Sequence, residues 1–237
     1  MAISELELPT HVTAHDFLGA SALAEGLAKA VATRLNAAID AKGQATLVVS
    51  GGRSPVAFFQ ALIEQPLDWS KVLVTLADER WVPTEHPDSN AGLLKRHLLT
   101  GKAAKARFLS LYRAAASLEA AALEADLALA ELPAIDVLVL GMGDDGHTAS
   151  LFPNSPNLTE GLDLQSTRRC LPMLAPSVPH QRLSMTRALL ATAGLTVLSV
   201  QGPGKLATLR AALQGTELNE MPIRAFLQDP LDIYWCP

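Results

Sequence analysis

The mainly apolar run at residues 135–140 ends at Gly141, where the chain continues as Gly-Met-Gly-Asp-Asp-Gly-His. A run of this length is typical of a buried parallel strand, and glycines directly after it permit a tight turn or a close approach of the backbone to a ligand. Ligands bind at the carboxyl edge of open α/β sheets. The segment therefore predicts a ligand-binding turn after a strand, although a plain turn in which His147 caps a helix would use the same residues.

Further short apolar runs alternate with helical patterns along the chain. Leucine and valine recur every fourth residue between positions 23 and 35, which is typical of an amphipathic helix. This alternation predicts one α/β domain over residues 1–237, with a mainly parallel sheet flanked by helices on both faces. The expected strands are 46–49, 72–77, 135–140, 169–174, 196–200 and 231–235, and the expected helices are 21–40, 56–63, 89–99, 117–131, 184–193 (at least from Met185 onward), 205–213 and 223–227.

The composition excludes several classes of protein. A formal net charge of −5 offers no basic stripe for nucleic-acid phosphates. Cys170 and Cys236 do not make a disulfide framework, and neither has the spacing of a metal ligand. No apolar stretch approaches the roughly 18 residues of a membrane span, and residues 1–9 contain no basic side chain, unlike a signal peptide. We therefore expect a cytoplasmic protein that binds neither nucleic acid nor membrane.

A glycine-rich loop follows the expected strand at 46–49 and consists of Ser50, Gly51, Gly52 and Arg53. Adjacent glycines let backbone N–H groups approach an anion, and the helix that follows offers its positive N-terminus. We expect Ser54 to cap that helix and Pro55 to be its first residue. The spacing matches neither a P-loop nor a dinucleotide fingerprint, so it favours a phosphate on a small molecule. A tight turn before a capped helix is the alternative.

Three cations also lie where strands and helices meet. Arg80 follows the expected strand at 72–77 within Asp78-Glu79-Arg80-Trp81, and arginine is suited to bidentate binding of phosphate. Lys205 stands in the first turn of a helix after Gly202-Pro203-Gly204, where a lysine is unfavourable unless a negative group is near. Arg182 could also reach an anion, but the sequence supports that role more weakly. A surface ion pair for Arg80 and a solvated lysine at position 205 are the plain alternatives.

His147 is the candidate general base, because an imidazole takes and returns a proton near neutral pH. Asp145, two residues earlier, or Asp78 could orient it. The sequence contains no GxSxG nucleophile elbow and no zinc motif, so we expect no metal and a water molecule activated directly by the base. The remaining histidines are predicted to be ordinary side chains without a role: His11, His15, His86, His97 and His180.

These segments together resemble the 6-phosphogluconolactonase family, the hydrolases of the oxidative pentose phosphate pathway. The stretch 145–153, Asp-Gly-His-Thr-Ala-Ser-Leu-Phe-Pro, is its most specific part. The related glucosamine-6-phosphate deaminases share the Asp-Gly-His turn but have a glutamate five positions after the histidine, where this chain has Phe152. The match extends over nearly the whole chain, through segments 50–55, 78–83, 88–90, 141–153 and 202–205.

The resemblance implies a Rossmann-like fold and hydrolysis of 6-phospho-D-glucono-1,5-lactone to 6-phosphogluconate, without a cofactor. His147 would activate water, and N–H groups near Gly143 and Gly146 could face the oxyanion. The 50–53 loop, Arg80 and Lys205 would hold the phosphate, with Arg182 as a further contact. A sugar-phosphate isomerase or deaminase and a non-catalytic sensor of sugar phosphates are the alternatives. We expect a monomer or a small homo-oligomer.

Overall fold

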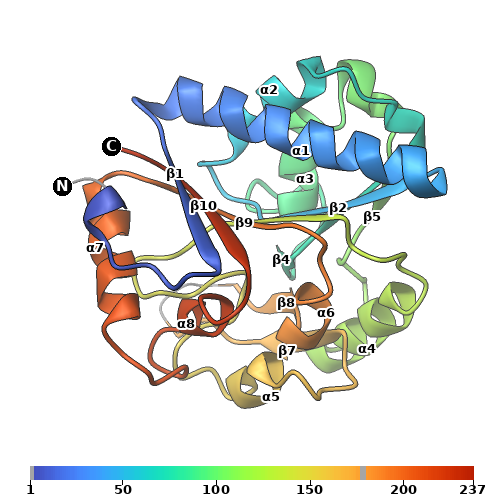
Figure 1. Cartoon of the computed structure of the whole chain (residues 1–237). Coiled ribbons are helices and arrows are strands. Elements are labelled where there is room, and N and C mark those ends of the chain that lie inside the picture. The colour runs from blue at the N-terminus through green and yellow to red at the C-terminus, as the bar shows by residue number, and fades with distance from the viewer. Residues whose placement is uncertain (1–2, 177–179) are drawn as a thin grey trace.

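The structure is a computed structural model that describes residues 3–176 and 180–237. A sheet of seven parallel strands runs through the molecule in the order β1-β10-β9-β6-β2-β3-β5 (Figure 1). This confirms the predicted α/β class and the parallel sheet. The strands are β1 Val12–Asp16, β2 Ala45–Val49, β3 Val72–Leu76, β5 Arg107–Leu109, β6 Val137–Leu140, β9 Thr196–Gln201 and β10 Leu231–Cys236.

The centre of the sheet is formed by β2 and β6. Every residue of both strands is buried, as expected for strands covered on both faces. They pair in parallel with Leu47 opposite Val137. The chain runs outward from β2 to β3 and β5 on one side and from β6 to β9 and β10 on the other, where the first strand, β1, forms the edge. The strand order therefore reverses between β2 and β6, and ligands of open α/β sheets bind at such a reversal.

Helices cover both faces of the sheet. In Figure 1, α1, α2 and α3 lie on one side of the sheet, and α4 to α8 lie on the other. The longest helix, α1, ends at Gly43, which adopts a φ of 78° that favours glycine. In the described chain no helix is both long and apolar enough to span a membrane. The helices are α1 Ala20–Lys42, α2 Val56–Glu64, α3 Asn90–His97, α4 Leu118–Leu129, α5 Leu158–Leu162, α6 Arg187–Leu190, α7 Pro203–Leu213 and α8 Ile223–Phe226.

The structure also has a second, antiparallel sheet of three strands, of which only one was predicted, the strand expected at 169–174. It consists of β4 Asp78–Arg80, β8 Arg182–Met185 and β7 Cys170–Met173, in the order β4-β8-β7. Its β7 strand packs against α4, on the lower side of the main sheet in Figure 1. The small sheet joins the end of β3 to a distant part of the chain, because the Met185 N–H donates to the Ala77 carbonyl at 2.8 Å.

The predicted helix at 184–193 is wrong over its first residues. Met185 belongs to strand β8, and the helix α6 is confined to Arg187–Leu190. Thr186 explains the difference, because it is extended (φ −77°, ψ 156°) and its hydroxyl accepts the Leu189 N–H. A threonine in this conformation caps a helix, so the helix begins only after it.

Two smaller predictions also differ from the structure. Ser54 does not cap α2, since Pro55 occupies the N-cap position and makes no side-chain cap bond there. Strand β1 was not expected, and its His15 Nε2 lies 3.3 Å from the accepting Oδ2 of Asp232 on the neighbouring strand. Strand β5 was missed as well, because three residues are too few to show a period.

Candidate active site

A cavity of about 180 Å³ opens at the carboxyl ends of β6, β2 and β3, where the strand order reverses. It brings together residues that the sequence separates by more than 130 positions, from Ser50 to Arg182. Asp145, Arg53 and Lys205 are not among the residues that line it. Eight of the predicted site residues do line it: Ser50, Gly51, Gly52, Asp78, Arg80, Gly143, His147 and Arg182.

His147 is fixed in the cavity wall by Asp145. The imidazole Nδ1 and the Asp145 Oδ1 are 2.5 Å apart, and the same oxygen accepts the His147 backbone N–H at 3.1 Å. Burial acts to raise the pKa of Asp145, but the hydrogen bond and charge of His147 outweigh it and lower that pKa below 3.8. A charged carboxylate at Nδ1 leaves Nε2 as the nitrogen available for proton transfer.

The turn that carries His147 needs glycine at two positions. A Cβ on Gly143 would clash with the imidazole of His147, so a side chain there would displace the ring. Gly146 has a φ of 77°, a conformation that side chains disfavour. The N–H groups of both glycines are already engaged, with the carbonyls of His147 and Gly143. These two N–H groups therefore do not face the cavity as oxyanion donors, and that expectation is wrong for them.

Asp78 does not contact the imidazole of His147. It binds the loop that carries His147, through Ser150. Its Oδ2 accepts the Ser150 hydroxyl at 2.6 Å, and the Ser150 N–H donates to the Ser184 hydroxyl oxygen at 3.3 Å. All three side chains are buried. The loop is thereby tied both to the end of β3 and to β8. Between the two candidates, the structure puts Asp145 against His147.

Phe152 packs against the other side of His147, with ring centroids 4.3 Å apart and planes inclined by 36°. The guanidinium carbon of Arg182 lies 5.6 Å from the centroid of the same phenyl ring. Phe152 therefore contributes an apolar contact to the imidazole. The imidazole is held between Asp145 and this ring.

The two arginines give the cavity its positive charge. Arg80 donates through Nη1 to the Asp88 carbonyl at 2.6 Å, while its buried Nε has no hydrogen-bond partner among the described residues. Arg182 is buried and donates through Nε to the His180 carbonyl at 3.1 Å. Burial lowers the pKa of Arg182, and the nearby Asp78 charge counteracts that effect. Buried cationic groups with spare donors are suited to an anionic ligand.

The glycine loop completes this end of the cavity. Gly52 has a φ of 92°, and a Cβ on Gly51 would clash with the carboxamide of Asn90. The Ser50 hydroxyl is buried without a hydrogen-bond partner in the described structure, which leaves it available to a ligand. Asn90, at the start of α3, lines the cavity and donates to the Asp78 carbonyl at 3.0 Å. We assigned it no role from sequence, although it lies within the segment 88–90 that carries the resemblance.

Lys205 and Arg53 lie outside this wall. The Lys205 Nζ is 2.6 Å from Asp144 Oδ1, so the negative group expected near this lysine is a carboxylate of the same chain. Arg53 is exposed. Their proposed contact with a phosphate would need them to move toward the cavity.

Comparison with known proteins places this architecture in a family. Residues 19–235 match the family described as glucosamine-6-phosphate isomerases/6-phosphogluconolactonase. The chain is similar to a 6-phosphogluconolactonase of Pseudomonas putida, with 73% identity over 100% of this chain and 98% of the relative. It is also similar to a 6-phosphogluconolactonase of Pseudomonas aeruginosa, with 64% identity over 100% of both.

A solved structure agrees with these sequence relatives. The crystal structure of a 6-phosphogluconolactonase from Shewanella baltica superimposes with a TM-score of 0.93 at 37% identity, over 98% of this chain and 100% of that one. The family resemblance seen in the sequence is thus confirmed. The chain belongs to the glucosamine-6-phosphate isomerase/6-phosphogluconolactonase family, and its relatives group it with the lactonases of that family.

Proposed function

We propose that this chain hydrolyses 6-phospho-D-glucono-1,5-lactone to 6-phosphogluconate, with His147 as the general base. The observation that carries the proposal is the placement of His147, oriented by Asp145, in the same cavity wall as Arg80 and Arg182. The close relatives named 6-phosphogluconolactonase support the choice of substrate.

The reaction starts at the neutral imidazole. Nε2 of His147 takes a proton from water as the water oxygen bonds to the lactone C1, and the carbonyl electrons move onto its oxygen. When the tetrahedral intermediate collapses, the bond between C1 and the ring oxygen breaks, and the imidazolium returns the proton to that oxygen. Asp145 stabilises the imidazolium in between, the role that an aspartate has in hydrolytic triads.

The phosphate is bound by the cationic end of the cavity. Arg80 Nε and the Ser50 hydroxyl are buried and lack partners in the described part of the chain, so a phosphate would satisfy both. The N–H groups of Gly51 and Gly52 and the buried Arg182 add further donors for the phosphate, whereas the Ser50 N–H is already bonded to the Val139 carbonyl. A phosphate held there fixes the lactone carbonyl relative to His147. The binding energy of the phosphate thus orients the reacting carbonyl, which lowers the entropic part of the barrier.

The direct test measures turnover of freshly made lactone, corrected for its spontaneous hydrolysis. The wild type should accelerate hydrolysis, and His147→Ala should lower kcat by about 10²–10⁴-fold, the usual contribution of a positioned proton-transfer group. 6-Phosphogluconate should bind that variant with unchanged affinity, because the phosphate grip is intact. Unchanged turnover in His147→Ala would remove the imidazole from the mechanism.

The same preparation separates the alternatives. Ammonia release from glucosamine 6-phosphate would identify a deaminase. Phe152 argues against that activity, because it places a phenyl ring and not a carboxylate beside the imidazole. Binding of 6-phosphogluconate without any turnover of the lactone would identify a sensor.

A further inference from the structure

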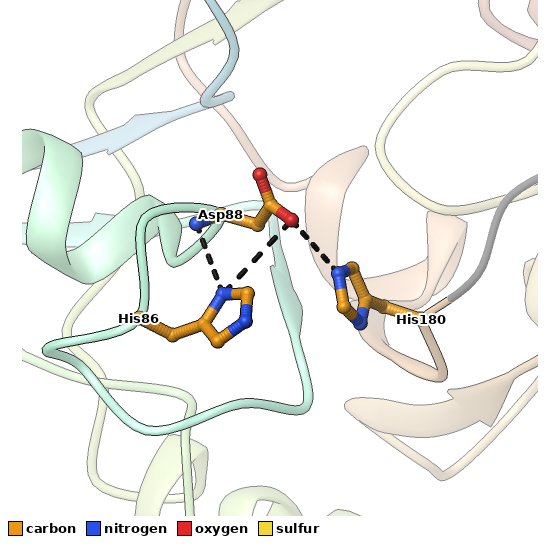
Figure 2. Close-up of side chains that lie close together, drawn as sticks. All are labelled: His86, Asp88 and His180. Atoms are coloured by element: carbon orange, nitrogen blue, oxygen red, sulfur yellow. Dashed lines mark hydrogen bonds and ion pairs between the residues drawn. The ribbon is translucent and has the colours of Figure 1, made fainter.

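Three side chains from two distant segments meet beside the active-site cavity: His86 and Asp88, which follow β4, and His180, which precedes β8 (Figure 2). The Asp88 Oδ2 lies 2.8 Å from Nε2 of His180 and 3.9 Å from Nδ1 of His86. The two imidazole rings meet edge to face, with centroids 5.2 Å apart. Neither histidine was expected to have a role, and the structure shows that both face one carboxylate.

Nδ1 of His86 and Nε2 of His180 both face the Asp88 carboxylate. One ligand atom from each residue can be chosen so that all three lie within 4.8 Å of one another. In a tetrahedral zinc site, bonds of about 2.0–2.2 Å put neighbouring ligand atoms roughly 3.3–3.5 Å apart. The two distances from Asp88 lie on either side of that spacing, so small side-chain rotations would bring the three atoms onto one ion.

An ion would replace two hydrogen bonds of the cluster. Nδ1 of His86 accepts the backbone N–H of Asp88 at 3.1 Å, and Nε2 of His180 donates to the Asp88 carboxylate at 2.8 Å, so both nitrogens exchange these bonds for metal bonds when they coordinate. The Asp88 carboxylate lies within ion-pair distance of both imidazoles, so only a small shift is needed for it to bind the same ion.

We propose that His86, Asp88 and His180 form a binding site for a divalent transition-metal ion of the zinc type, with one coordination position left for water. Two imidazoles and one carboxylate are ligands that zinc accepts, whereas Mg²⁺ and Ca²⁺ prefer oxygen ligands. The side chains are between 25% and 53% exposed, so an ion can enter from solvent. The nearby positive charge of Arg80 weakens the site and further disfavours ions that bind only through charge.

The bound ion would join the two segments that carry the cavity arginines. Arg80 donates to the carbonyl of Asp88, and Arg182 donates to the carbonyl of His180. Each arginine is therefore anchored on the backbone of a metal ligand. An ion that fixes Asp88 to His180 would fix both anchoring carbonyls relative to each other.

The experiment titrates the untagged, chelator-treated protein with Zn²⁺ by calorimetry, and with Co²⁺ by visible absorption, which reports tetrahedral coordination. We expect one equivalent to bind. Loss of outer-shell partners typically costs about 10–100-fold in metal affinity, so loss of a ligand in His86→Ala or His180→Ala should cost about 100-fold or more. Asp88→Asn, which keeps the side-chain volume, should weaken binding similarly. Circular dichroism verifies that each variant is folded.

Two matched variants remove an imidazole elsewhere. His97→Ala, at the end of α3, and His147→Ala, in the cavity wall, should bind Zn²⁺ as the wild type does. Zn²⁺ should also raise the Tm of the wild type but not of His180→Ala, because a ligand that binds only the native state stabilises it. Absence of one-to-one binding, binding that survives in the double variant His86→Ala/His180→Ala, or binding lost in His147→Ala would each overturn the proposal.

Discussion

The contact between Asp145 and Nδ1 of His147 is the residue-scale feature on which the proposed proton transfer through Nε2 rests. Asp145 accepts from both the ring and the backbone of His147, so it fixes the orientation of the ring. Its neighbour Asp144 points elsewhere, to Lys205. Two adjacent carboxylates in one turn therefore have separable roles.

This difference predicts the outcome of a matched pair of substitutions. Asp145→Asn should lower kcat by about 10²-fold or more, because the carboxamide no longer stabilises the imidazolium. Asp144→Asn should leave kcat near the wild-type value, since Asp144 contacts Lys205 and not the ring. Initial rates on fresh lactone at pH 7, corrected for spontaneous hydrolysis, check both. Equal effects of the two substitutions would contradict the assignment.

The arginines predict a second matched pair. Arg80→Ala should raise KM by about 10–100-fold, the usual value of a hydrogen bond to a charged group, while Arg53→Ala should change it little. Arg80 lines the cavity with an unpartnered Nε among the described residues, whereas Arg53 is exposed and does not line it. Steady-state kinetics on the lactone distinguishes them. A larger KM effect at position 53 would show that the loop moves onto the phosphate.

At the scale of elements, the loop between β6 and α5 is shaped by close approaches. Gly143→Ala should lower kcat by about 10-fold or more at an unchanged Tm, because the added Cβ forces the His147 ring out of its position. The control is Gly204→Ala in helix α7, where a Cβ meets nothing within 4 Å. That variant should keep wild-type kcat. A normal kcat for Gly143→Ala would mean that the ring position is not required.

The start of α3 is held by a buried carboxylate. Glu79 accepts the N–H groups of Arg80, Asn90 and Ala91 and the hydroxyl of Ser89. Burial raises its pKa above 4.5, although the three N–H groups oppose this. Glu79 thus positions Asn90 in the cavity wall from inside the protein.

Glu79→Gln should lower the free energy of unfolding by about 1–3 kcal/mol at pH 7, because one carboxamide oxygen cannot accept all four donors. The folded state binds the Glu79 proton more tightly than the unfolded state, so this group stabilises the wild type more as the pH falls from 7 toward 4.5. The stability difference between wild type and variant should therefore widen over that interval. Urea unfolding at several pH values measures it, and a difference that narrows would contradict the raised pKa.

The sequence predicted the elements of the main sheet better than those beside it. β2, β3, β6, β9 and β10 are long apolar runs, and each was found within a few residues of its bounds. The strands β4 and β8 were missed because they are short, polar and paired with each other across about a hundred residues. Pairing over that separation leaves no local period to detect. The missing small sheet is also why Met185 was assigned to a helix.

The same reason limits prediction of the site. His147 and Asp145 are two residues apart, so their contact could be anticipated from the turn. The bond between Asp78 and Ser150, and the packing of Phe152 on the imidazole, depend on how the loop folds back. The cluster of His86, Asp88 and His180 depends on the antiparallel pairing of β4 with β8. No sequence pattern predicts that pairing, so the cluster could not be predicted either.

At the scale of the whole molecule, both cysteines are buried in one continuous core. Burial raises the pKa of the Cys170 thiol to about 12. We expect no reaction of Cys170 with a thiol reagent at pH 8 in the native protein, and full reaction in denaturant. Mass spectrometry after timed alkylation checks this. Rapid labelling of Cys170 under native conditions would show that the core around β7 opens easily.

The strand order has a consequence for biosynthesis. β1 lies at the edge of the main sheet and pairs with β10, which is separated from it by more than 200 residues and also binds β9. While the chain is being translated, the amino-terminal strand therefore has no neighbour until the last strand has left the ribosome. We expect its docking to be slow, because the loop-closure entropy of so long a separation has to be paid before the β1–β10 contacts form. Until then the nascent protein exposes an open edge to which chaperones have access.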